Sequence, residues 1–99
     1  MPKKQHTITA KVWMYQGDSP WHFITIDQPE SRILESEYIW PRRGFGSIPV
    51  SATVGDTEWR TSIFPDKFGT YLLPIKKSVR TDEDIHNGDT VSVNLCVIS

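Results

Sequence analysis

Alternation of apolar and polar residues dominates the chain and predicts a mainly β protein. Residues 7–15 alternate between an apolar set that begins at Ile8 and a polar set that begins at Thr7, which is typical of a strand with one buried face. Residues 21–26 are rich in aromatic and β-branched side chains, and turn formers occupy positions 17–20. The pattern therefore predicts two strands that pair as a hairpin.

The same period of two returns in the second half of the chain. Alternation over residues 47–54 and 57–64, on either side of Gly55-Asp56, predicts a second hairpin. A short strand is expected at 70–75, and residues 90–98 carry an apolar side chain at every second position. Six short strands favour a closed or nearly closed β-barrel, because closure leaves no exposed sheet edge.

Two segments depart from this period and predict helices. Residues from about 29 to 39 place Ile33, Leu34 and Tyr38 on one helical face, so we expect the main helix there. Residues from about 76 to 81 predict a short helical turn with Val79 directed inward.

Length and composition predict one domain over residues 1–99, since the chain is too short for a second core. Eleven basic and twelve acidic side chains leave a net charge of −1, which argues against binding to nucleic acid or membranes through excess positive charge. The single cysteine, Cys96, excludes an internal disulfide and indicates a reducing compartment. The sequence shows no membrane-spanning apolar run and no signal-peptide pattern at its start, so we expect a cytoplasmic location.

Charge is distributed unevenly along the chain. Residues 42–80 carry a net charge of +4, while the remainder carries −5. Guanidinium and ammonium groups bind phosphate and carboxylate, and an aromatic side chain beside them offers a stacking face. If barrel closure brings these groups together, they form an anion site; otherwise they are separate solvated surface charges. The candidate binding residues are Arg42, Arg43, Arg60, Lys76, Lys77, Arg80 and Trp59.

Signals for catalysis and metal binding are weak. The three histidines, His6, His22 and His86, lack the spacing of a metal motif, and the chain has no second cysteine, so we expect no metal site and no cofactor. Ser62 and Cys96 are candidate nucleophiles, but neither has a neighbouring base in the sequence.

Three segments of the chain form a recognisable set. They are Arg43–Val50, Trp59–Pro65, and Tyr71–Arg80 followed by Gly88-Asp89-Thr90-Val91. Together they resemble one bacterial family, the domain of unknown function DUF1905, and this resemblance extends over nearly the whole chain. The family is similar to double-split β-barrels, so the resemblance implies that architecture but no established activity. The stretch from Leu73 to Val91 is also similar to the swapped hairpins of AbrB and MazE proteins.

These observations support three hypotheses. The preferred one is a non-catalytic binding module that recognises an anionic small molecule, or an acidic surface of a partner protein, through the basic residues. The alternative is a dimeric DNA-binding transcription factor of the AbrB type, which the near-neutral charge disfavours. The weaker alternative is an enzyme with Cys96 or Ser62 as nucleophile. Both a monomer and a homodimer are compatible with the sequence.

Overall fold

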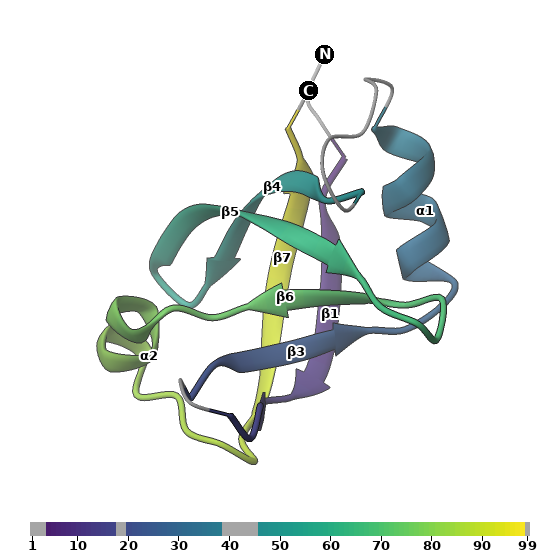
Figure 1. Cartoon of the computed structure of the whole chain (residues 1–99). Helices are drawn as coiled ribbons and strands as arrows, with labels where there is room; N and C mark the ends of the chain where they lie inside the picture. The colour runs from purple at the N-terminus through teal and green to yellow at the C-terminus, as the bar shows by residue number, and fades with distance from the viewer. Residues whose placement is uncertain (1–3, 18–19, 39–45, 99) are drawn as a thin grey trace.

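A computed structural model describes residues 4–17, 20–38 and 46–98 of the chain (Figure 1). Within these ranges the chain forms seven strands and two short helices, which confirms the predicted mainly β class. The elements in chain order are β1 (His6–Lys11), β2 (Trp13–Met14), β3 (His22–Ile26), α1 (Glu30–Glu37), β4 (Ile48–Val54), β5 (Thr57–Pro65), β6 (Tyr71–Pro74), α2 (Lys77–Glu83) and β7 (Thr90–Val97).

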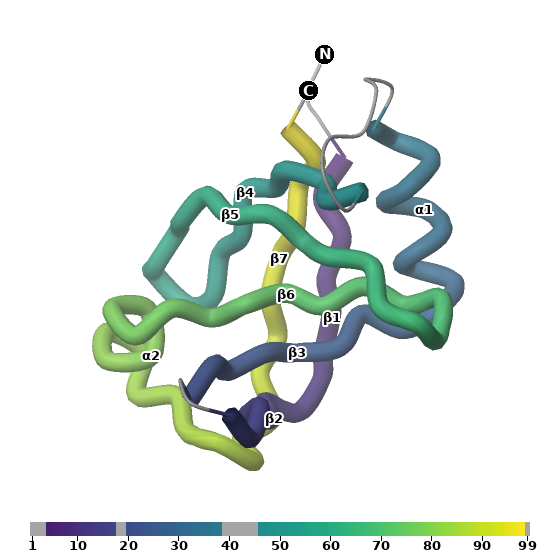
Figure 2. Tube along the Cα trace, in the orientation of Figure 1, coloured from purple at the N-terminus to yellow at the C-terminus, as the bar shows by residue number. Residues whose placement is uncertain are grey.

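The strands form one antiparallel sheet in the order β1-β7-β4-β5-β6-β3-β2, which curls into a nearly closed barrel. The first and last strands pair, with His6 opposite Leu95 and Lys11 opposite Thr90. In Figure 2, β7 and β1 run side by side, and β5, β6 and β3 cross in front of them. The fold therefore brings the two ends of the chain together within one sheet.

The barrel interior holds the apolar side chains that alternate along the strands. Burial of each large aliphatic side chain contributes about 1.5–3 kcal/mol, so this set is the main source of stability. Each helix adds one buried apolar side chain to this core, Leu34 from α1 and Val79 from α2. Ile33, predicted to share the face of Leu34, is instead 40% exposed. The fully buried strand residues include Ile24, Ile26, Ile48, Val50, Ile63, Leu73, Val93 and Leu95.

The first strand differs from its prediction, because the expected strand over 7–15 divides at Val12. The Val12 N–H donates to the Asp89 carbonyl, and the Gly88 N–H donates to the Val12 carbonyl, both at 2.8 Å. These bonds hold the end of β1 against β7 and against the turn that precedes β7. Only β2 is therefore left to pair with β3. The predicted hairpin between 7–15 and 21–26 is therefore wrong except at β2, and seven strands replace the expected six.

The two helices lie close to their predicted positions. Helix α1 covers residues 30–37 rather than 29–39, because the backbone is already extended at Tyr38. Helix α2 covers 77–83 rather than 76–81 and ends where Asp84 adopts the left-handed conformation. Neither helix in the described ranges is long and apolar enough to span a membrane.

Polar contacts attach each helix to the barrel. On α1, the Ser31 hydroxyl donates to the Ile26 carbonyl and accepts a hydrogen bond of 3.2 Å from the Tyr71 N–H. These contacts tie the beginning of the helix to both β3 and β6.

At the far end of α2, Glu83 attaches the helix to the β4–β5 turn. The Thr57 hydroxyl donates to the Glu83 carboxylate at 2.6 Å. A Cβ added to Gly55 would lie 2.0 Å from a Glu83 carboxylate oxygen, and the φ of Gly55 is +57°. A residue without a side chain therefore allows this close approach.

Candidate functional site

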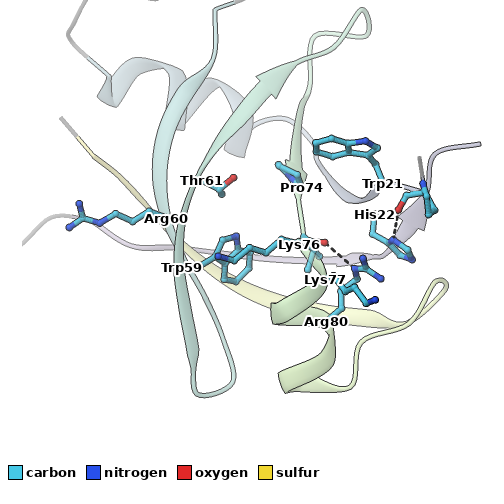
Figure 3. A pocket seen from close by; sticks show the side chains of 11 residues that line it. Trp21, His22, Trp59, Arg60, Thr61, Pro74, Lys76, Lys77 and Arg80 are labelled. Carbon is cyan, nitrogen blue, oxygen red and sulfur yellow. Dashed lines mark hydrogen bonds between the residues drawn. The ribbon is translucent and has the colours of Figure 1, made fainter. Parts of the chain in front are cut away.

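A cavity opens where β5 and β6 separate. The ladder between these strands contains two residue pairs, Phe64 with Leu72 and Pro65 with Tyr71. Beyond them β5 stays paired with β4, while β6 stays paired with β3 and leads into α2. The gap between the two strands holds a cavity of about 300 Å³ (Figure 3).

The inner wall of this cavity is apolar. Trp59 and Ile75 are 6% and 2% exposed and form its floor. Thr61 shares the inward face of β5 with Trp59 because residues two apart in a strand point to the same side. At the rim, Trp21 is 56% exposed, so a large aromatic surface borders the opening.

Three cationic side chains from α2 and its N-cap residue line the same cavity. Lys76 and Lys77 are exposed, whereas Arg80 is half-buried. The Arg80 Nε donates to the Ile75 carbonyl at 3.1 Å, which fixes the guanidinium beside the wall (Figure 3). In the described part of the chain, none of the three forms an ion pair with a carboxylate. The cavity therefore carries positive charge without a described counter-charge.

Folding of α2 does not explain this placement of lysines. Lys76 is the N-cap residue, Lys77 is the first helical residue, and the first turn contains no acidic side chain. The positive end of a helix dipole disfavours cations by about 0.3–1 kcal/mol each near the surface. The lysines thus stand where they lower the stability of the helix.

The floor also contains an unpartnered polar group. The Trp59 Nε1–H is buried and has no hydrogen-bond acceptor among the described residues. A buried donor without an acceptor costs about 1–3 kcal/mol and is rare in folded proteins. Like the two lysines at the start of α2, this unpartnered donor lowers the stability of the fold.

Five of the seven predicted binding residues line this one cavity: Trp59, Arg60, Lys76, Lys77 and Arg80. Arg60 contributes to the wall, but its side chain extends away from the other cations in Figure 3, because it lies on the opposite face of β5 from Trp59. Arg42 and Arg43 lie outside the described residues. Whether any of these residues binds a ligand stays a prediction.

Sequence reasoning did not find Trp21 and His22 as cavity residues. They reach the site because β3 pairs with β6, with Phe23 opposite Pro74, and because the Ile75 N–H donates to the His22 carbonyl at 2.9 Å. This contact joins segments about fifty residues apart in the sequence. The available signal in the sequence is a tryptophan, Trp21, directly after the turn formers at positions 17–20.

Two other candidate groups, Cys96 and His6, lie outside this cavity. Cys96 is half-buried, and its Sγ lies 3.8 Å from the Val97 carbonyl, with no histidine or carboxylate bonded to it among the described residues. His6 contacts Glu37 at 2.8 Å, so this histidine has a structural partner. The described ranges contain no group of three or more histidine, cysteine or acidic side chains placed to hold a metal. The β5–β6 cavity is therefore the candidate functional site.

Comparison with known proteins concerns the chain as a whole. None of the curated proteins compared with it matches. The likeness to AbrB and MazE proteins stays a prediction. A family model described as Domain of unknown function (DUF1905) matches residues 9–95, which include every strand that borders the cavity. Because this match covers most of the sequence and agrees with the predicted resemblance, the chain belongs to the DUF1905 family.

Proposed function

We propose that this domain is a binding module for a small anionic ligand held in the β5–β6 cavity. The observation that carries the proposal is the convergence of Lys76, Lys77 and Arg80 on one apolar-floored cavity without a described carboxylate partner. An anion at this position supplies the missing counter-charge.

Arg80 is the central residue of the proposed site. Its Nε is already bonded to the Ile75 carbonyl, so the remaining guanidinium N–H groups are oriented before a ligand arrives. A planar guanidinium binds carboxylate or phosphate through two parallel hydrogen bonds, and its partial burial reduces screening by solvent. Lys76 and Lys77 are exposed, so each adds a smaller and more salt-sensitive attraction.

The shape of the site favours a small molecule over a macromolecular partner. Small-molecule pockets begin at about 300 Å³, which the cavity reaches. Duplex DNA engages several phosphates along an extended surface, whereas these three cations line a single concavity and the chain has a net charge of −1. A small anion is therefore the ligand class that the geometry supports best.

Calorimetric titration with pyrophosphate tests this proposal. We expect saturable binding that weakens as salt is added, because exposed charges are screened. Lys77→Ala should reduce the affinity severalfold. Lys67→Ala is the matched control, since it removes the same charge from an exposed lysine that lies over Phe68, outside the cavity. No binding, or equal effects of the two substitutions, would contradict the proposal.

A further inference from the structure

We infer that the ligand of this cavity is a nucleoside phosphate whose base stacks on Trp21 while its phosphate contacts the α2 cations. The inference rests on the proposed function, because it assumes that the cavity binds an anion. It adds the chemical class of that anion.

A row of three aromatic rings supports the base-binding part. Trp21 stacks on Phe23 with ring centroids 6.2 Å apart and planes 11° apart, and Phe23 packs against Trp13 at 5.1 Å. The Trp13 Nε1–H donates to the Thr25 hydroxyl at 2.9 Å, which fixes the far end of the row. Trp21 is thus supported from behind while 56% of it remains exposed. Such a fixed aromatic surface loses little conformational freedom when a base stacks on it.

The cations suit a phosphate monoester. A phosphate monoester carries a charge of about −1.5 to −2 near neutral pH, whereas a single carboxylate carries one charge. Three cations on one cavity match the larger charge, and the guanidinium of Arg80 provides the planar donor pair that phosphate oxygens accept.

The two parts lie at opposite sides of the same cavity. Figure 3 places Trp21 on one side of Pro74 and the Lys76, Lys77 and Arg80 side chains on the other. A ligand that contacts both parts needs a planar ring and an anionic group joined by a short spacer. A nucleoside phosphate has this arrangement, with the ribose as spacer.

The experiment compares adenosine 5′-monophosphate with ribose 5-phosphate by calorimetry, since ribose 5-phosphate carries an anomeric hydroxyl group in place of the base. Stacking on an aromatic side chain predicts that the nucleotide binds about tenfold more tightly. Trp21→Leu should abolish this difference and leave the affinity for ribose 5-phosphate unchanged. Phe68→Leu, at another exposed aromatic residue away from the cavity, is the matched control and should change neither affinity.

Three results would overturn the inference in distinguishable ways. Equal affinities for the two compounds would contradict the stacking of the base on Trp21 but would still agree with an anion site in the cavity. No binding of either compound would contradict the proposed function as well. Much tighter binding of a single-stranded adenylate tetranucleotide would assign the base and phosphate to a nucleic-acid strand rather than to a free nucleotide. Circular dichroism of the Trp21→Leu protein establishes that it is folded.

Discussion

The two helices of this domain make different kinds of polar contact. Helix α1 is joined to the barrel at both ends, because Ser31 bonds Ile26 and Tyr71, and Glu37 contacts His6. Its polar groups that face the sheet therefore have partners within the protein.

Helix α2 has such a contact at its end, where Glu83 accepts from Thr57. The N-cap residue Lys76, the first helical residue Lys77 and Arg80 of the last turn line the cavity without a described carboxylate partner. Polar groups that hold a fold together are satisfied internally, whereas groups that meet a ligand are left available. Substitutions on the α1 side should therefore lower stability, and substitutions of these three cations should lower binding.

The largest effect is expected on the α1 side. Ser31→Ala leaves the Tyr71 N–H and the Ile26 carbonyl without the hydroxyl that bonds them, so we expect the free energy of unfolding to fall by about 2–4 kcal/mol. Urea denaturation measures this change. Ser36→Ala, which removes an exposed hydroxyl from the same helix, should change stability by less than about 0.5 kcal/mol. Similar losses of unfolding free energy in both variants would contradict the structural role assigned to Ser31.

The next effect is on binding. Arg80→Met keeps an apolar stem against the wall but removes the guanidinium, so we expect pyrophosphate affinity to fall by about 10- to 100-fold, or about 1.4–2.8 kcal/mol. Calorimetry measures the affinity, and urea denaturation should show a smaller change than in Ser31→Ala, because Arg80→Met removes one described hydrogen bond, to the Ile75 carbonyl, whereas Ser31→Ala removes two. A variant that is strongly destabilised but binds normally would reverse the assigned roles.

Gly55→Ala tests the contact between the end of α2 and the β4–β5 turn, which resembles the contacts of α1. The positive φ and the nearby Glu83 carboxylate predict a loss of about 1–2 kcal/mol in the free energy of unfolding. In a Glu83→Ala background the steric part of this loss should disappear while the backbone part remains. Full additivity of the two substitutions would show that the side-chain contact is unimportant.

The smallest effect has the opposite sign. Lys77→Glu places a negative charge at the positive end of α2, so the free energy of unfolding should rise by about 0.5 kcal/mol while pyrophosphate binding weakens. Thermal unfolding with and without pyrophosphate separates the two changes. A fall in stability would mean that Lys77 has a structural role.

Much of the barrel follows from local pattern. Alternation over 47–54, 57–64 and 90–98 predicts β4, β5 and β7 because a strand with one buried face needs every second residue to be apolar. The pairing of β1 with β7 is not predictable in this way, since it depends on contacts between opposite ends of the chain. The division at Val12 follows from the same long-range contacts.

The candidate site, too, is only partly predictable from local sequence. Lys76, Lys77 and Arg80 adjoin in sequence, so their clustering is visible locally. Trp21 joins them through the β3–β6 pairing, which no local pattern contains. Arg60 shows where alternation was informative: its neighbour Trp59 faces inward, so Arg60 faces outward.

The most direct test of the central claim is to follow the indole N–H resonances of isotope-labelled protein during a pyrophosphate titration. An anion in the β5–β6 cavity should shift the resonances of Trp59 and Trp21, which line it, and leave that of Trp13, which is bonded to Thr25, in place. The shifts should saturate and should persist in Lys67→Ala. Unchanged Trp59 and Trp21 resonances at saturating pyrophosphate would contradict binding in this cavity.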